Sequence, residues 1–317
     1  MEKRQDNFKK IKLALKVCHL YYEDGLSQNE IAKQLGISRP TISRLLTYAR
    51  DNNLVRIEIS DPINDLGVIE KKLEDKYKLK KVLISFDATD NSHLINEKLG
   101  ELTANYLDQI VTDNSSIGIS WGKTIESVAD HLHNSTRNGV SVVQLKGSVS
   151  SSDMNNFAND IVKKFSAAFH TNALTLPLPV IFDDSVTKEI VLKDRFISEI
   201  IHAGERTNIA LFTAGTVRSD AMLFNLGYFN KNEINRLQSN AVGDIVSRFI
   251  SRNGSVADST INERTVGISL EELKHKEYAI LVAGSSRKVQ PIHAALIGGY
   301  ANVLITDSQS AETLLSM

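Results

Sequence analysis

The chain has 317 residues, a formal net charge of −1 and a 42% share of hydrophobic residues. This length accommodates two or three domains with packed cores, and no run of about eighteen apolar residues is present to span a membrane. The single cysteine, Cys18, excludes an internal disulfide and a zinc site built from cysteines. Because the charged first residues are not followed by an apolar segment, we expect no signal peptide and a cytoplasmic protein.

The near-neutral total hides an asymmetry between the two ends of the chain. Residues 1–60 hold eleven Lys and Arg against seven Asp and Glu, a net of +4, so the rest must carry −5 to give −1. A basic module on an acidic body is typical of DNA binding by the first part. We therefore predict a DNA-binding domain over residues 1–60 and a second domain over 61–317.

The stretch at residues 27–52, SQNEIAKQLGISRPTISRLLTYARDN, predicts two short helices joined by a tight turn. Ser27, with a Glu three residues later, forms a capping box at the start of the first helix. Gly36 tolerates the left-handed conformation that ends a helix. Ser38 caps the second helix, and Pro40 lies in its first turn, where its missing N–H costs no hydrogen bond.

The second of these helices has a buried face and an outward face. Its apolar stripe is Ile42, Leu45, Leu46 and Ala49, and the outward side is rich in Arg, Ser, Thr and one Tyr, Tyr48. Such side chains bind base edges and phosphates, and the arrangement is that of a helix-turn-helix motif; the alternative is an ordinary helical hairpin. The residues that we expect at the DNA are Gln28, Ser38, Arg39, Thr41, Ser43 and Arg44.

The segments around this motif complete the first domain. Lys9–Asp24 predicts a supporting helix, with Ile11, Leu15, Cys18 and Tyr22 on one face. Residues 54–60 alternate like a strand and predict a wing that brings Arg56 near the phosphate backbone. Asp65–Lys78 predicts a connecting helix.

From residue 80 the pattern changes to short apolar runs that alternate with helical stretches. The predicted strands are 81–87, 116–120, 141–145, 208–213, 278–283 and 302–307, and the predicted helices are 93–110, 122–133, 155–170, 186–202 and 288–298. This alternation favours an α/β fold with a doubly wound, Rossmann-like parallel sheet. Ligands bind such sheets at the carboxyl ends of the strands, so the loops there are the candidate site.

Four of these loops combine small residues with a helix start, and all four also carry Lys or Arg. They are Ser120–Thr124, Gln144–Ser148, Thr213–Arg218 and Gly284–Lys288. Free backbone N–H groups at helix N-termini bind phosphate, and Lys and Arg strengthen that binding. A further turn offers Asp244 to sugar hydroxyls, and the polar Asn262–Arg264 is a candidate for the same cleft. Together the loops predict a phosphosugar site.

Lys146 stands at the end of a predicted buried strand, where an unpaired ammonium is costly. Either it reaches solvent with its long side chain, or it has an anionic partner in the protein or in a ligand. Other features are less informative: His131 and His133 lack a third metal ligand, and Asp183–Asp184 fits a solvated turn. We expect neither a metal nor a cofactor.

With these residues in view, the chain resembles the SorC-type sugar-binding transcriptional regulators of bacteria over nearly its whole length. The segments that carry the resemblance are SQNEIAKQLGISRPTISRLL, GISWGKT, VVQLKG, LPLPVIFD, ALFTAGTVR, AVGDIVSRF and ILVAGSSRK. The resemblance implies a helix-turn-helix module joined to a domain of the NagB/RpiA sugar-phosphate isomerase type. It also implies a homodimer or homotetramer on operator DNA, read through Ser38–Arg44, and a sugar-phosphate effector.

The resemblance further implies that residues 121–124, 215–216, 243–244 and 284–288 line the effector pocket. Together with the loop around Lys146, the expected site is Trp121, Gly122, Lys123, Thr124, Gln144, Lys146, Gly147, Gly215, Thr216, Gly243, Asp244, Gly284, Ser285, Arg287 and Lys288. Many family members carry other residues in place of Lys146. A lysine facing an aldehyde sugar forms a Schiff base if its pKa is lowered enough to free the amine.

The function that we expect is a repressor of deoxyribonucleoside catabolism, since the likeness is closest to the branch of the family that controls it. Deoxyribose 5-phosphate, which opens readily to an aldehyde, is the expected effector that releases a palindromic operator. One alternative is a regulator of the same class that answers to another sugar phosphate or acts as an activator. The other is a sugar-phosphate isomerase or Schiff-base lyase, although no clear acid–base pair accompanies Lys146.

Overall fold

A computed structural model describes residues 2–55, 62–86, 91–148 and 155–317. By its internal contacts the chain divides into two compact units, Met1–Asp61 and Pro62–Met317. No helix within the described ranges is long and apolar enough to cross a membrane. Each unit has its own hydrophobic core and is described by itself.

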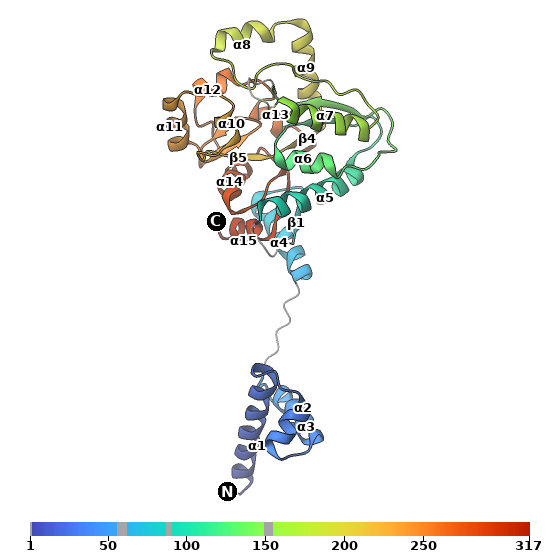
Figure 1. Ribbon diagram of the computed structural model, residues 1–317, viewed down its shortest axis with the longest axis vertical. Helices are drawn as coiled ribbons and strands as arrows, with labels where there is room; N and C mark the ends of the chain where they lie inside the picture. The colour runs from blue at the N-terminus through green and yellow to red at the C-terminus, as the bar shows by residue number, and fades with distance from the viewer. Residues whose placement is uncertain (1, 56–61, 87–90, 149–154) are drawn as a thin grey trace. The chain divides into compact units, whose positions relative to one another are not determined.

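The first unit is a helical bundle (Figure 1). Its elements are α1 (Glu2–Cys18), a π-helical turn (His19–Glu23), α2 (Gln28–Leu35) and α3 (Arg39–Asp51). The predicted capping box is confirmed, because Ser27 Oγ accepts the Glu30 N–H and Glu30 accepts the Ser27 N–H. Gly36 ends α2 at φ 68°, and Ser38 caps α3 through the Thr41 N–H.

The core of this unit is small and closes around α3. Its buried residues are Ala14, Val17, Cys18, Ile31, Ile42, Leu45, Leu46 and Ala49. Two predictions were wrong here. Tyr22 is exposed, because the π-turn adds a residue to the helical repeat and rotates it off the apolar face. Tyr48 is half-buried against the core, with Lys10 Nζ 4.0 Å from its ring centre.

The predicted wing strand at 54–60 lies mostly outside the described residues, and the described Leu54 and Val55 form no strand. The second unit begins with the predicted connecting helix, α4 (Pro62–Tyr77). Its carboxylates Glu70 and Glu74 accept the backbone N–H groups of Ile84 and Val82 at 2.9 and 3.1 Å. The helix thereby satisfies the open edge of the first strand of the sheet.

The centre of the second unit is a six-stranded parallel sheet in the order β1-β9-β8-β4-β2-β3. All its strand pairs run parallel. The strands are β1 (Lys81–Ser85), β2 (Ser116–Ile119), β3 (Ser141–Gln144), β4 (Ile209–Phe212), β8 (Tyr278–Val282) and β9 (Val303–Asp307). All six predicted strands are confirmed, as is the parallel α/β class, because each run is apolar enough for burial on both faces.

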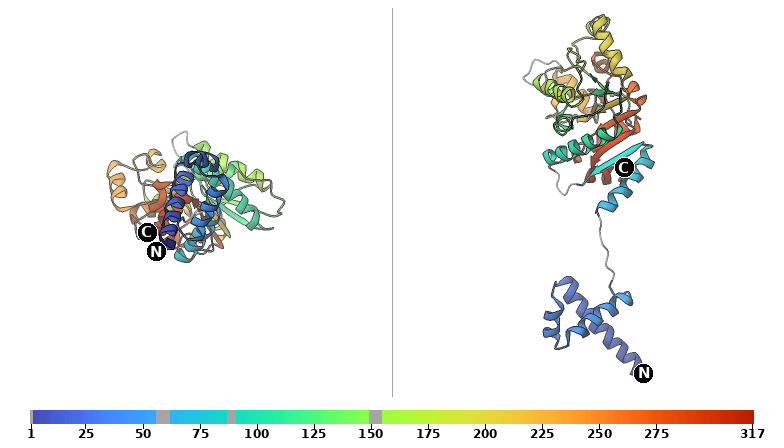
Figure 2. Two further views of the ribbon diagram at one scale, coloured as in Figure 1. Left: turned by 90° about the horizontal axis from the view of Figure 1, so that it is seen from below. Right: turned by 90° about the vertical axis from the view of Figure 1, so that its right-hand side faces the viewer.

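Two hydrophobic cores lie on opposite faces of the sheet (Figures 1 and 2). Along β8, Ile280 and Val282 belong to one core and Ala279 and Leu281 to the other, as strand alternation requires. Helices α5 (Ser92–Ile110), α6 (Lys123–Asp130) and α7 (Asn155–Ala168) complete the first core. Helices α4, α13 (Leu270–Lys274), α14 (Val289–Ile297) and α15 (Ser308–Ser316) complete the second. The sheet is therefore doubly wound, as predicted.

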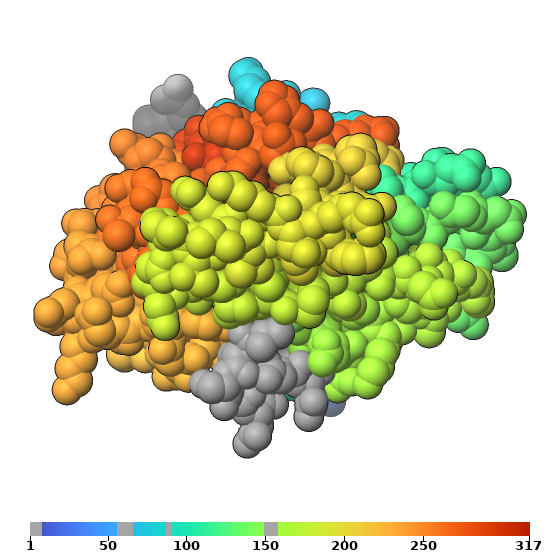
Figure 3. Space-filling model, turned by 90° about the horizontal axis from the view of Figure 1, so that it is seen from above, coloured from blue at the N-terminus to red at the C-terminus, as the bar shows by residue number. Residues whose placement is uncertain are grey.

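The remaining elements differ from the sequence prediction at one predicted helix and at a second sheet that was not predicted. The predicted helix at 186–202 is two helices, α8 (Ser185–Leu192) and α9 (Arg195–Arg206), because Asp194 caps a new start by accepting the N–H groups of Phe196 and Ile197. Both helices lie on the surface, where they appear yellow-green and yellow in Figure 3. The other helices are α10 (Met222–Asn225), α11 (Lys231–Asn240), α12 (Ser259–Arg264) and a 3-10 turn (Ser286–Lys288).

A second sheet was not predicted. Strands β5 (Ala214–Thr216), β6 (Gly243–Ile245) and β7 (Arg248–Ile250) pair antiparallel in the order β5-β6-β7. The first two segments read as loops in the sequence because three residues are too few to show an alternating pattern. This small sheet brings Gly215 opposite Asp244, two residues that are far apart in the chain.

Candidate functional site

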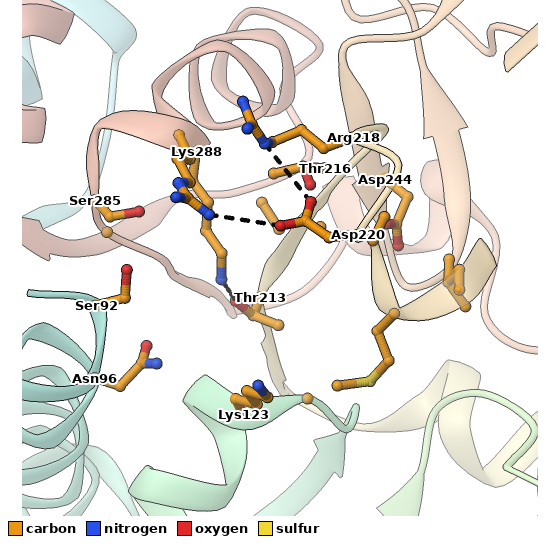
Figure 4. A pocket seen from close by; sticks show the side chains of 18 of the residues that line it. Ser92, Asn96, Lys123, Thr213, Thr216, Arg218, Asp220, Asp244, Ser285 and Lys288 are labelled. Carbon is orange, nitrogen blue, oxygen red and sulfur yellow. Dashed lines mark hydrogen bonds and ion pairs between the residues drawn. The ribbon is translucent and has the colours of Figure 1, made fainter. Parts of the chain in front are cut away.

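A cavity of about 290 Å³ opens at the carboxyl ends of the parallel strands. The lining residues come from six segments: Ser92, Asn96, Trp121, Gly122, Lys123, Lys146, Thr213, Ala214, Gly215, Thr216, Arg218, Asp220, Ala221, Met222, Leu223, Asp244, Gly284, Ser285, Arg287 and Lys288. Polar side chains from these segments point into one shared space (Figure 4). This is the position at which doubly wound sheets bind ligands.

The cavity carries a positive charge. Five cations, Lys123, Lys146, Arg218, Arg287 and Lys288, line it together with two carboxylates, Asp220 and Asp244. The excess of three positive charges favours an anionic ligand. Helix α6 begins at this wall, after Gly122, without a side-chain cap on its first N–H groups. Charge and free N–H donors together suit a phosphate group.

Lys288 is the cation best connected within the cavity. Its Nζ lies 3.3 Å from Thr124 Oγ1 and 3.5 Å from Thr213 Oγ1, and the Thr124 hydroxyl donates to Asn96 Oδ1 at 2.9 Å. Burial lowers the pKa of Lys288 to about 8, the Asp244 carboxylate opposes that shift and Lys123 reinforces it. A dianionic guest would relieve this crowding of positive charge.

Lys146 is buried, with 5% of its surface exposed, so it does not reach solvent from the strand end. Its Nζ donates to Ser247 Oγ at 3.0 Å and lies 3.7 Å from the ring centre of Trp121. Burial lowers the pKa of Lys146 from 10.5 to about 8, and the Asp244 carboxylate opposes that shift. At pH 7 a pKa of about 8 leaves about a tenth of this amine unprotonated and nucleophilic, far more than in an ordinary lysine.

Asp244 is the buried counter-charge. Its Oδ2 accepts the Ser247 N–H at 3.1 Å, and burial raises its pKa while Lys146 opposes the rise. Opposite it stands Gly215, where a Cβ atom would collide with Asp244 Oδ1. The carboxylate therefore depends on a glycine at position 215 for its place in the cavity wall.

The mouth of the cavity holds a more exposed group of charges. Asp220 lies 3.6 Å from Arg218 Nε and 3.6 Å from Arg287 Nη1. Figure 4 marks the pair of Asp220 with Arg218 by a dashed line. All three side chains are more than half exposed, so these ion pairs are weak. They leave the two guanidinium groups available to a stronger anion.

Eleven of the residues singled out in the sequence line this cavity: Trp121, Gly122, Lys123, Lys146, Gly215, Thr216, Asp244, Gly284, Ser285, Arg287 and Lys288. Four others lie behind its wall. Thr124 contacts Lys288 by its hydroxyl, Gln144 accepts the Leu176 N–H, Gly147 accepts the Trp121 indole N–H, and Gly243 packs against Pro291. Their part is to hold the lining residues in place.

The polar segment Asn262–Arg264 does not line the cavity. Asn262 Oδ1 accepts from the Arg248 guanidinium at 2.7 Å, and Arg264 pairs with Glu233. Conversely, Ser92, Asn96 and Asp220 do line it and were not singled out in the sequence. The first two follow β1 at the start of α5, so the strand-end rule applied to the first predicted strand would have included them.

The candidate DNA interface lies on α3 in the first unit. Ser38, Arg39, Thr41, Ser43 and Arg44 are all exposed, and Gln28 is half-buried at the start of α2. The opposite side of α3 is buried in the core. The helix therefore presents a continuous polar surface with two guanidinium groups.

Comparisons with known proteins agree with both units. Residues 61–316 match the Sugar-bind family of sugar-binding domains, and residues 15–52 match region 4 of sigma-70 factors. The deoxyribonucleoside regulator of Bacillus subtilis is 46% identical, over 97% of this chain and 98% of the relative. The crystal structure of the full-length sorbitol operon regulator of Klebsiella pneumoniae superimposes with a TM-score of 0.73 at 27% identity, over 96% and 98% of the two chains.

A domain of a sugar-binding transcriptional regulator from Arthrobacter aurescens matches 78% of this chain and 97% of its own, with a TM-score of 0.72 at 28% identity. These relatives are regulators, and the isomerase or lyase considered from the sequence finds no support among them. The chain is a sugar-responsive transcriptional regulator with a helix-turn-helix module, and it belongs to the SorC-type family of sugar-binding regulators.

Proposed function

We propose that the protein represses genes of deoxyribonucleoside catabolism and leaves its operator when deoxyribose 5-phosphate binds. The observation that carries the choice of ligand is Lys146, a buried amine inside a cation-lined cavity. A phosphorylated sugar with a reactive aldehyde uses both features. The 46% identity to the deoxyribonucleoside regulator supports the same choice.

The cavity fits this ligand in size and charge. At about 290 Å³ it is close to the lower end of the range for ligand pockets, which suits a small metabolite. The phosphate would be held by Lys288, the Thr213 hydroxyl and the first N–H groups of α6, which begins beside Thr213. Asp244 would accept from the sugar hydroxyls, and the aldehyde carbon would face Lys146.

At Lys146 the proposed bond is a Schiff base. The neutral amine adds to the aldehyde carbon, the resulting carbinolamine loses water, and a C=N bond remains. Its formation fixes the ligand in the cavity without consuming a reductant or an oxidant. Binding alters repression only if the effector has a higher affinity for the state that binds DNA less well.

The proposal includes a dimer or tetramer on a palindromic operator, since paired helix-turn-helix modules read two half-sites. Helices α8 and α9 expose Val186, Ile190 and Phe196, each at least 64% accessible, and apolar surface of this kind supports a contact between two copies. Sedimentation of the wild type and of Phe196→Glu tests this contact. Dissociation of the variant into smaller species is the supporting result, and an unchanged assembly would move the contact elsewhere.

A thermal melt with a panel of sugars tests the effector. The panel contains deoxyribose 5-phosphate, ribose 5-phosphate, fructose phosphates and unphosphorylated deoxyribose. A ligand that binds the native state raises the melting temperature by mass action. We expect the largest rise with deoxyribose 5-phosphate, whereas a rise with another sugar phosphate alone would keep the regulator and discard this effector. Mass spectrometry after borohydride reduction then tests for the adduct at Lys146.

A further inference from the structure

The turn between β6 and β7 has an unusual backbone. Ile245 pairs with Arg248, which leaves Val246 and Ser247 as a two-residue turn with φ of 46° and 66°. Turns with two positive φ angles favour Asn-Gly or Gly-Gly, and a β-branched residue at positive φ is an outlier. Both residues are also buried, at 2% and 0% exposure. The sequence therefore places two strained residues in a turn whose Ser247 contacts Lys146 and Asp244, two residues that line the cavity.

Strained turns of this kind are common at functional sites. The contacts of Ser247 indicate which groups this turn holds in position. The Ser247 hydroxyl accepts from Lys146 Nζ at 3.0 Å, and its N–H donates to Asp244 Oδ2 at 3.1 Å. A glycine would fit the backbone better but would leave Lys146 without this hydroxyl. Serine at this position thus serves the amine and the carboxylate together.

The neighbouring Arg248 locks the turn to the segment behind Lys146. Its guanidinium donates to the carbonyl oxygens of Ile268 at 2.7 Å and Gly267 at 2.9 Å. Gly267 in turn forms an antiparallel bridge with Lys146. The backbone of the lysine and the hydroxyl that meets its amine are therefore fixed to each other by one buried group.

We propose that Ser247 is the residue that positions Lys146 for reaction with the aldehyde of the effector. The inference rests on the proposed function. The hydroxyl lies on one side of Nζ and the indole of Trp121 on another, which restricts the directions open to the nitrogen lone pair. A hydrogen bond accepted from N–H leaves that lone pair free to attack.

The step that Ser247 assists is balanced within the protein and the sugar. The Nζ lone pair forms the C–N bond as the carbonyl π electrons move to oxygen, which takes a proton, while nitrogen gives one up. The hydroxyl of the carbinolamine then takes a second proton and leaves as water while the nitrogen lone pair forms the C=N bond, and the iminium nitrogen gives up its remaining proton. Amine and aldehyde yield imine and water, with no change of oxidation state.

Four side chains at position 247 separate positioning from stability. Serine and threonine carry the hydroxyl, whereas Ser247→Ala and Ser247→Gly lack it. The same four residues have a different order of preference for the positive φ at this position. Glycine adopts it most easily, alanine less easily, and the β-branched threonine least easily. The experiment incubates the full-length protein with deoxyribose 5-phosphate, quenches samples with borohydride over time, and measures the Lys146 adduct by mass spectrometry.

The rate is compared across pH, because loss of the hydroxyl also changes the protonation of Lys146. Without its acceptor the ammonium form is less stable, so the midpoint of the pH profile should move to lower pH. Above that midpoint the amine is neutral in every variant, and the plateau rate then reports position alone. We expect plateau rates for Ser and Thr within about threefold of each other, and at least about tenfold lower rates for Ala and Gly.

We expect melting temperatures to follow the tolerance of the backbone instead. Ser247→Gly should melt at the highest temperature, Ala and Ser should lie between, and Ser247→Thr should melt at the lowest. Adduct rates that follow these melting temperatures instead of the hydroxyl would overturn the role of Ser247, as would four equal plateau rates. Absence of any adduct in the wild type would overturn the covalent part of the proposed function, and the role of Ser247 with it. An adduct in the wild type that forms equally fast in Ser247→Gly would overturn this inference alone.

Discussion

The candidate sites of the two units are built from the chain in different ways. In the first unit, one continuous stretch of 26 residues, 27–52, forms both helices, their caps and the exposed face of α3. In the second, the cavity gathers residues from six segments between Ser92 and Lys288. Local patterns specify the first kind of site, and the topology of the sheet specifies the second. Substitutions within one site that leave the assembly of copies intact should therefore leave the binding of the other unit's ligand intact.

The largest effect should come from Lys146→Met, which removes the amine and keeps the length of the side chain. We expect no borohydride-trapped adduct and a much smaller melting shift with deoxyribose 5-phosphate. Affinity for operator DNA without the sugar should be unchanged, because the substitution lies in the second unit.

Lys276 provides the matched control, since it is also a buried lysine with a pKa lowered by burial. Its Nζ donates to the carbonyl oxygens of Gly204 and Glu205 at the end of α9, outside the cavity. Lys276→Met should cost about 1–3 kcal/mol of stability and leave the adduct intact. If both variants lost the adduct, the loss would reflect the effect of removing a buried lysine on folding, and it would not identify Lys146 as the reacting amine.

The next largest effect should come from Gly215→Ala. A methyl group there collides with Asp244 Oδ1, so the carboxylate must move. We expect the affinity for the sugar phosphate, measured by calorimetry, to fall at least about tenfold, or about 1.4 kcal/mol. Gly67→Ala on α4, where the added carbon meets nothing within 4 Å, is the control and should bind normally. Equal binding by both variants would remove Asp244 from the site.

In the first unit, Arg44→Ala should weaken operator binding by about 1–3 kcal/mol if its guanidinium reads a base. The probe is the duplex that the wild type selects from random DNA, and fluorescence anisotropy measures the affinity. The exposed Arg137 of the second unit supplies the control, as Arg137→Ala removes the same charge elsewhere. Unchanged affinity of Arg44→Ala would show that this side chain points away from the DNA.

The smallest effect is a dependence of stability on pH. Because the folded pKa of Lys146 is about 8 and its ordinary value is 10.5, the unfolded chain binds more protons between these values. Stability therefore rises with pH across this window, with a slope of at most about 1.4 kcal/mol per unit from this group. Measured by urea unfolding, the free energy of unfolding of the wild type should therefore rise with pH relative to that of Lys146→Met over that window. If the free energies of unfolding of the two proteins changed with pH in parallel, the pKa of Lys146 would be close to its ordinary value of 10.5.

The same contrast explains how much of the molecule the sequence predicts. Caps such as Ser27 and Gly36 act within four residues, so the two helices at 27–52 and their caps were predicted, although Tyr48 was placed on the wrong face. The six parallel strands were predicted because each is an apolar run buried on both faces. Tyr22 was placed wrongly because a single π-turn shifts the helical phase without a clear sequence signal.

The cavity was predicted in its loops but not in its assembly. The cationic loop at 284–288 and Lys146 were singled out because their chemistry is unusual at strand ends. The pairing of Gly215 with Asp244 arises from a sheet whose strands are three residues long, and periodicity is not detectable over three residues. Asp220 became visible only when the structure brought it beside Arg287, whereas Asn96 follows the first predicted strand.

The most direct test of the central claim is a titration of the selected operator with full-length protein, with and without deoxyribose 5-phosphate. The account predicts that the sugar phosphate weakens operator binding in the wild type and has little effect in Lys146→Met. A wild-type affinity that deoxyribose 5-phosphate leaves unchanged, while another sugar phosphate reduces it, would contradict the proposed effector.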